Sequence, residues 1–350
     1  MAINAWEKRK LASLVHFIGT GKSTFTLHPS KDKIFRFPVL GSTSIIGYDS
    51  SYDVEGKMIL TARVGANAGN LYIYSGKAKI TDNTVFLVTD TPSFLKALLD
   101  HFDLKKIKFG TGQPLIKASE LKRLKLFVPC DPTELDSIQD CVLNINNLIA
   151  ATQGKLDQLE MVKKALLQHL FDQSMRFKGY SDPWEKRKLA SLVHFIGTGK
   201  STFTLHPSKD KIFRFPVLGS TSIIGYDSSY DVEGKMILTA RVGANAGNLY
   251  IYSGKAKITD NTVFLVTDTP SFLKALLDHF DLKKIKFGTG QPLIKASELK
   301  RLKLFVPCDP TELDSIQDCV LNINNLIAAT QSKLSGLESL KKALLQGLFI

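Results

Sequence analysis

The sequence predicts an α+β protein with two small mixed α/β domains separated by two long helices, which pair as an antiparallel coiled coil with pseudo-two-fold symmetry. Three observations lead to this prediction. The chain contains an identical internal repeat, each copy mixes strand and helix patterns, and each copy ends in a long heptad pattern.

The repeat decides the domain organisation. Residues 6–153 recur letter for letter as residues 184–331, whereas the tails of the two copies differ. Neutral drift would scatter substitutions through surface positions, so the duplication is recent or deliberate; recombination and a built fusion both stay open. We expect domains at 1–130 and 184–308, long helices at 131–172 and 309–350, and a polar linker at 173–183.

Within the first copy, apolar and alternating runs predict three strands, and glycines 65, 69 and 76 are interpreted as turns. A proline at a helix start and apolar residues on one face predict a helix that follows them. A short helix and a closing strand complete the domain. The strands are expected at 57–64, 71–74, 84–88 and 125–128, and the helices at 90–100 and 119–124.

The first long helix is expected to begin at Asp131, because an N-cap aspartate, a helix-starting proline and Glu134 follow in register. Apolar residues then recur at steps of three and four over about 38 residues, which is typical of a coiled-coil seam. A helix with one apolar stripe needs a partner of equal length, and residues 309–349 supply one. The seam positions are Leu135, Ile138, Val142, Ile145, Ile149, Leu156, Leu159, Val162, Leu166 and Leu170.

The composition and charge of the chain limit the classes of function that it can have. The chain of 350 residues has 44% hydrophobic residues and a formal charge of +13, which favours a polyanionic partner. Apolar runs are too short for a membrane span and no secretion signal is evident, so we expect a cytoplasmic protein. The four cysteines, Cys130, Cys141, Cys308 and Cys319, fit neither a metal site nor a disulfide framework, and each is expected to be a buried thiol.

The sequence favours no catalytic site, and we expect the chain to bind no metal or cofactor. The run Gly19-Thr-Gly-Lys-Ser resembles a phosphate-binding loop, but His16 stands where that pattern requires its first glycine. An NTP-binding site is therefore the less favoured interpretation. The preferred interpretation is a turn that carries Lys22 to a phosphate of a nucleic-acid backbone. The chain also lacks the Asn/Asp-Pro-Pro-aromatic tetrapeptide that amino-methyltransferases of DNA use around a flipped base.

Charge placement favours DNA contact. Residues 105–125 hold seven basic side chains against one acid, Glu120. Gln113 has the geometry to pair with an adenine edge, while Arg63 and Asn67 follow a strand between glycines. The candidate contacts in the first copy are Thr20, Lys22, Ser42, Thr43, Arg63, Asn67, Lys105, Lys106, Thr111, Gln113 and Lys117. Their equivalents in the second copy are Thr198, Lys200, Ser220, Thr221, Arg241, Asn245, Lys283, Lys284, Thr289, Gln291 and Lys295.

The order of several segments resembles the specificity subunit of Type I restriction-modification systems, across essentially the whole chain. The segments are Trp6 to Ala12 with the Gly19 turn, Ile59 to Gly65, Ala68 to Asn70, Asp82-Asn83, and Gly110 to Gln113 leading through 121–129 to the long helix.

This resemblance implies two target-recognition domains joined by antiparallel helices, each domain reading one half of a split DNA site. It also implies modification (methyltransferase) subunits that bind S-adenosylmethionine and restriction (translocase and nuclease) subunits that use ATP and Mg as partners, and these partners carry the catalytic residues. Family members normally have two different domains, whereas identical domains related by two-fold symmetry predict a palindromic, interrupted target. The alternative is a coiled-coil protein-interaction scaffold that reads no DNA sequence.

Overall fold

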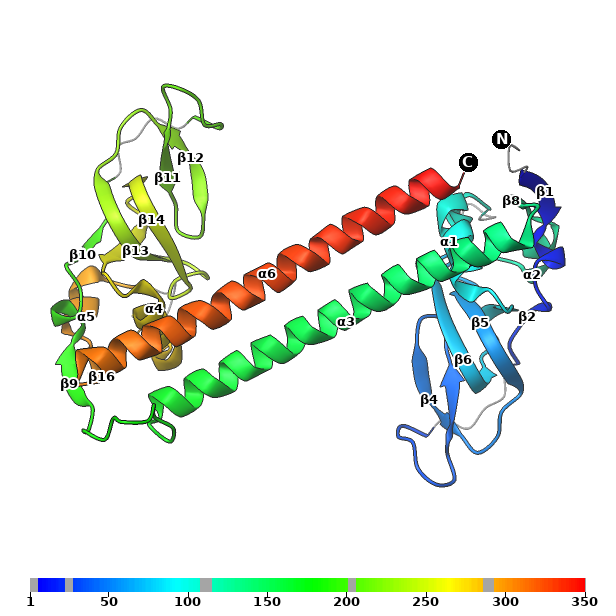
Figure 1. Ribbon diagram of the computed structural model, residues 1–350, viewed down its shortest axis with the longest axis horizontal. Helices are drawn as coiled ribbons and strands as arrows, with labels where there is room; N and C mark the ends of the chain where they lie inside the picture. The colour runs from blue at the N-terminus through cyan, green and yellow to red at the C-terminus, as the bar shows by residue number, and fades with distance from the viewer. Residues whose placement is uncertain (1–5, 23–27, 108–114, 201–205, 286–292, 350) are drawn as a thin grey trace. The chain divides into compact units, whose positions relative to one another are not determined.

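The computed structural model describes residues 6–22, 28–107, 115–200, 206–285 and 293–349. It divides into two compact units, residues 1–154 with 332–350 and residues 155–331 (Figure 1). Each unit therefore contains one copy of the globular domain together with a part of each long helix.

The first unit is built on a six-stranded sheet of order β2-β7-β5-β6-β3-β4. All neighbouring strands are antiparallel except β3 and β6, which are parallel. The strands are β2 (Phe17–Thr20), β3 (Phe37–Leu40), β4 (Ile45–Asp49), β5 (Val54–Ala62), β6 (Leu71–Ile80) and β7 (Thr84–Val88). β1 (Trp6–Lys10) pairs with β8 (Lys125–Pro129) in a separate antiparallel sheet.

Helices complete this unit. They are η1 (Leu11–Ser13), α1 (Pro92–Phe102), η2 (Leu104–Ile107) and α2 (Ala118–Arg123), followed by the long helix α3 (Pro132–Phe171). α1 begins at its proline and ends at Phe102, and the C-cap residue Asp103 adopts the left-handed conformation with φ of 59°.

The second unit repeats the same elements in the same topology. Its sheet has the order β10-β15-β13-β14-β11-β12, and β9 pairs with β16. The elements are β9 (Glu185–Lys188), η3 (Leu189–Ser191), β10 (Phe195–Thr198), β11 (Phe215–Leu218), β12 (Ile223–Asp227), β13 (Val232–Ala240), β14 (Leu249–Ile258), β15 (Thr262–Val266), α4 (Pro270–Phe280), η4 (Leu282–Ile285), α5 (Ala296–Arg301), β16 (Lys303–Val306) and α6 (Pro310–Leu348).

Successive side chains of β5 enter two different cores. Ile59 packs in a cluster with Leu95 and Leu98 of α1 and with Ile138 and other residues of the helices. Its neighbours Met58 and Leu60 lie in a second cluster, with Phe86 of β7 and Ile80 of β6. The sheet is thus buried on both faces in its middle, which is why residues 58–62 form a continuous apolar run rather than an alternating one.

The two long helices run antiparallel inside each unit. In the first unit, Val142 near the start of α3 and Leu345 near the end of α6 belong to the same core. Phe349 closes this core, with its ring centroid 6.2 Å from Trp6 and 5.9 Å from Phe94. In the second unit, Phe171 at the end of α3 makes the equivalent contacts with Trp184 and Phe272.

The predicted fold class is confirmed, with corrections in detail. β1 to β4 are absent from the sequence-based assignment, and β6 continues six residues beyond Tyr74, to Ile80. Gly76 is not a turn but a strand residue paired with Gly56, and φ values of +131° and +139° let the two strands bend there.

Two predictions about burial are wrong. Val162 was placed in the helix seam, but it is 56% exposed, and its equivalent Leu340 is 51% exposed. Cys130, Cys141 and Cys308 are exposed, and Cys319 is half-buried, because they lie on the solvent side of the turns and helices that carry them. In the described ranges, no helix has an apolar stretch sufficient to span a bilayer.

Candidate nucleic-acid interface

Within the described residues, the candidate contacts of the first copy gather around the β6–β7 turn, residues 81–83. The backbone N–H of Arg63, just past β5, donates to the carbonyl of Asn83 at 2.8 Å. The carbonyl of Arg63 accepts from the N–H of Ile116 at 2.7 Å, which brings Lys117 to the same place. The side chains of Arg63 and Lys117 are both exposed.

The loop that carries Asn67 is tightly folded against η2. Its backbone closes in two turns, from Ala68 N–H to the Gly65 carbonyl and from Asn70 N–H to the Asn67 carbonyl, both at 3.0 Å. Gly69 has φ of +90°, and a Cβ there would lie 3.3 Å from the backbone nitrogen of Lys105. This approach places Lys105 and Lys106, both exposed, beside the loop.

The end of β2 reaches the same turn from the other side. Gly21 donates its N–H to the carbonyl of Thr84 at 3.0 Å, and a Cβ on Gly21 would lie 2.2 Å from the carbonyl oxygen of Ile80. Only glycine fits between these backbones, so Thr20 and Lys22 are held next to the β6–β7 turn. Gly21 therefore serves the close packing of strands. Gly19 lies within β2, and among the described residues no helix lies between β2 and β3, whereas a phosphate-binding loop leads into a helix.

Ser42 and Thr43 lie in the β3–β4 hairpin. Leu40 accepts the N–H of Thr81 at 3.1 Å, and the hydroxyl of Tyr72 donates to the Gly41 carbonyl at 2.5 Å. Burial raises the pKa of Tyr72 well above its ordinary value, so this hydroxyl keeps its proton. The hairpin is thereby tied to the end of β6.

The structure thus places the nine described candidates of the first copy on segments that meet around the β6–β7 turn. In the described part of the chain, Arg63, Lys105, Lys106 and Lys117 form no ion pair with a carboxylate, so their charges face solvent. Thr111 and Gln113, with Thr289 and Gln291, lie outside the described residues. The second copy repeats the arrangement, with Arg241 bonded to Asn261 and to Ile294 at 2.8 Å.

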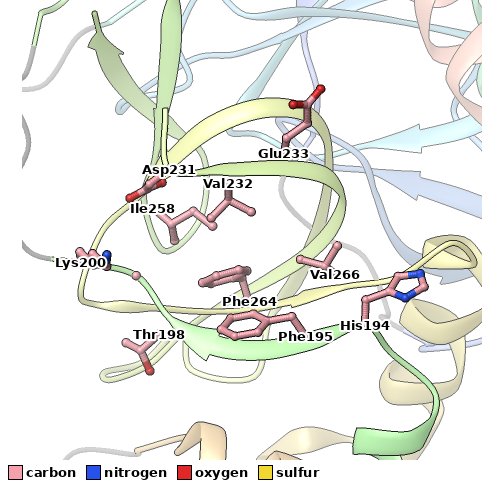
Figure 2. A pocket seen from close by; sticks show the side chains of 11 residues that line it. His194, Phe195, Thr198, Lys200, Asp231, Val232, Glu233, Ile258, Phe264 and Val266 are labelled. Carbon is pink, nitrogen blue, oxygen red and sulfur yellow. The ribbon is translucent and has the colours of Figure 1, made fainter. Parts of the chain in front are cut away.

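Beside these contacts each domain has a pocket that the sequence did not indicate. In the second unit its volume is about 400 Å³, and Figure 2 shows Phe195 and Phe264 next to each other inside it, with their ring centroids 5.3 Å apart. His194 lies at one end, and Lys200 and Asp231 at the other. Asp231 is exposed, but its partial desolvation at the pocket raises its pKa above the ordinary value, against the opposing effects of its own backbone N–H, Lys257 and Lys200.

The pocket of the first unit has a volume of about 440 Å³ and the equivalent lining, including His16, Phe17, Lys22 and Asp53. His16 lies 2.7 Å from a carboxylate oxygen of Asp90. Phe17 is 51% exposed, and it was not selected from the sequence because β2 was not predicted. The pocket offers an aromatic interior with a charged rim.

Comparison with known proteins identifies relatives of the whole chain. The family model for the Type I restriction modification DNA specificity domain matches residues 4–161 and again residues 181–348. The crystal structure of a Type-I restriction-modification system S subunit from M. genitalium superposes with a TM-score of 0.78 at 15% identity, covering 100% of this chain and 97% of that one.

Two further structures are less similar. A structure from a study of complex assembly and conformational transition of the type I R-M system has a TM-score of 0.47 at 15% identity, covering 98% of this chain and 97% of that one. The HsdS subunit from Thermoanaerobacter tengcongensis has a TM-score of 0.41 at 14% identity, covering 98% and 96%. No curated protein sequence matches the chain significantly.

Proposed function

Because the chain belongs to the family of Type I restriction modification DNA specificity domains, we propose that it directs a restriction-modification complex to a bipartite, palindromic and interrupted DNA site. One observation carries the proposal: the family match occurs twice, on two domains whose sequences are identical. Identical domains have identical preferences for bases, so two-fold related domains require the same half-site twice in inverted orientation.

The residues around the β6–β7 turn suit the two tasks of a domain that recognises DNA, which are to bind phosphates and to discriminate between bases. Lys105, Lys106 and Lys117 are exposed and form no ion pair among the described residues, so their ammonium groups can neutralise phosphates and give affinity that depends on salt. Arg63 and Asn67 carry the side chains that pair best with guanine and adenine edges, so we assign them to base discrimination. Thr20, Lys22, Ser42 and Thr43 flank them as phosphate contacts.

We further propose that the chain is not an enzyme and binds no cofactor itself. Its sequence lacks the tetrapeptide of amino-methyltransferases, and the Gly19 run lacks the first glycine of a phosphate-binding loop. S-adenosylmethionine, ATP and Mg then belong to the modification and restriction subunits, with which the chain assembles on DNA in the cytoplasm.

The experiment is single-molecule sequencing of adenine methylation in a host that expresses this chain with its modification subunit. We expect methylated adenines in one interrupted palindrome. If the subunits co-purify and no new methylation appears, the chain is a scaffold; if the two halves of the methylated site differ, the symmetric reading is wrong.

The repeat offers a sharper version of this experiment. Arg63→Ala changes one copy only, so we expect discrimination between bases to weaken in one half of the DNA site. Arg63→Ala together with Arg241→Ala should weaken it in both halves. Lys155→Ala, at an exposed lysine of α3, is the matched control and leaves the methylated sequence unchanged. Unchanged methylation in the double variant would remove Arg63 from base reading.

A further inference from the structure

The two copies place the same tryptophan and glutamate in different surroundings. In the second unit, Glu312 is 1% exposed and accepts two hydrogen bonds from the guanidinium of Arg176, from Nε at 2.9 Å and from Nη2 at 2.7 Å. The indole Nε1 of Trp184 donates to the same carboxylate at 3.2 Å. Arg176 comes from the segment 173–183, which follows α3.

The rest of this segment is also fixed to the second unit. The hydroxyl of Tyr180 donates to Thr311 Oγ1 at 3.1 Å, and the thiol of Cys308 donates to the Pro183 carbonyl at 2.9 Å. Phe177 packs against the core, and Ser174 contacts His169 at the end of α3. The expected polar linker is therefore held to the second unit by specific hydrogen bonds and by packing of Phe177.

The first unit has residues equivalent to those that hold this segment in the second unit. Trp6 Nε1 donates to Glu134 Oε1 at 3.2 Å, as Trp184 does to Glu312. The other carboxylate oxygen, Oε2 of Glu134, is shielded from solvent and has no hydrogen-bond partner among the described residues. The equivalents of Thr311 and Cys308 are Thr133 and Cys130, and both are present in the identical sequence.

A pocket of about 380 Å³ adjoins this carboxylate. Gly347 lines it, at the position where the second unit has His169, and a Cβ on Gly347 would meet nothing within 4 Å. The other lining residues are Trp6, Glu134, Ser137, Ile138, Cys141 and Leu348. Residues 1–5, Met-Ala-Ile-Asn-Ala, contain no arginine or lysine to serve as the counterpart of Arg176.

A shielded carboxylate oxygen without a donor is costly, and a cation that donates hydrogen bonds removes that cost. Arginine suits this site better than lysine, because its planar guanidinium binds both oxygens of a carboxylate at once while Lys acts as a point charge. The chain itself provides the precedent, since the equivalent tryptophan and glutamate of the second unit, Trp184 and Glu312, hold Arg176 in this way.

We propose that the Trp6–Glu134 pocket is a docking site for an arginine-bearing peptide segment of a partner protein. The segment has the chemistry of residues 173–183, with an arginine on Glu134 and a tyrosine hydroxyl four residues later on the start of α3. Such docking does not depend on the recognition of DNA. It would give Glu134 of the first unit the arginine contact that Glu312 of the second unit makes within the chain.

The test uses the full chain and a fluorescent synthetic peptide with the sequence of residues 173–183, followed by fluorescence anisotropy. We expect saturable binding of one peptide per chain, because the chain's own segment covers Glu312. Replacing the peptide's arginine by glutamine, or changing Glu134→Gln in the protein, should weaken binding by about 10-fold to 100-fold.

Asp136→Asn is the matched control, since it removes a carboxylate from the same helix turn at an exposed position and should change the affinity less than about 2-fold. The peptide variant needs no change in the protein, so the test holds even if Glu134→Gln does not fold. No binding at about 1 mM peptide, or equal binding of the arginine and glutamine peptides, overturns the proposal.

Discussion

The ion pair between Arg176 and Glu312 allows a quantitative prediction about the second unit. Arg176→Met keeps an apolar stem and removes the guanidinium with both of its hydrogen bonds to Glu312. The carboxylate, 1% exposed, is then left with the indole of Trp184 as its donor among the described residues. Breaking a buried pair by removing one partner costs about 3–5 kcal/mol.

We expect the lower end of this range, about 3 kcal/mol, because the side chain of Arg176 is 17% exposed and water reaches the pair. A second change, Glu312→Gln in the Arg176→Met background, removes the buried charge. It should recover about 1–2 kcal/mol, since a neutral amide is less costly to leave without a partner.

The assay is urea unfolding followed by tryptophan fluorescence. The chain has only two tryptophans, Trp6 and Trp184, so Trp6→Phe leaves Trp184 as the reporter of the second unit. Trp184→Phe leaves Trp6 for the first unit, where Arg176→Met should have no effect. A loss below about 0.5 kcal/mol, or a double variant no more stable than the single one, would refute the reasoning.

Three further predictions concern the domains. Gly21→Ala should destabilise the first unit by about 1–3 kcal/mol, because its Cβ meets the carbonyl of Ile80, and the Trp6 reporter should detect this in urea. Partial desolvation raises the pKa of Asp53 above its ordinary value of 3.8, so folding disfavours its charged form. Asp53→Asn should therefore stabilise the protein at pH 7, by a small amount because the residue is exposed to solvent, and this gain should vanish below pH 3.8 in the same assay. Lys105→Ala with Lys106→Ala should weaken DNA binding for all sequences and reduce the slope of log affinity against log salt by about 2, as measured by titration at several salt concentrations; an unchanged slope would exclude both from phosphate contact.

Local patterns in the sequence were sufficient to predict the helices and strands that have strong hydrophobic periodicity. β7 has the predicted bounds, and α3 starts at the proline that follows the N-cap Asp131. In contrast, β1 to β4 were not predicted. Each is only four or five residues long, and β1, β2 and β3 pair with strands far away in sequence, as β1 does with β8. Gly76 appeared to be a turn because a glycine inside a bent strand has the same local signature as one in a loop.

For the candidate site, the sequence selected side chains by type but not their arrangement. The sequence indicated which side chains suit DNA, but their convergence on the β6–β7 turn comes from hydrogen bonds such as Arg63 to Asn83, which no spacing rule supplies. The aromatic pocket of Phe17 and Phe86 likewise depends on the pairing of β2 with β7.

The sequence by itself determined the two-copy organisation, the long helices and the family, because identity and periodicity are properties of the chain. Only the tertiary structure decided how the unlike tails are used. Arg176 reaches Glu312 across 136 residues, while the equivalent Glu134 keeps an oxygen without a donor among the described residues. The two identical glutamates therefore have different surroundings, because their hydrogen-bond donors come from the segments that the fold places beside them and not from the repeated sequence.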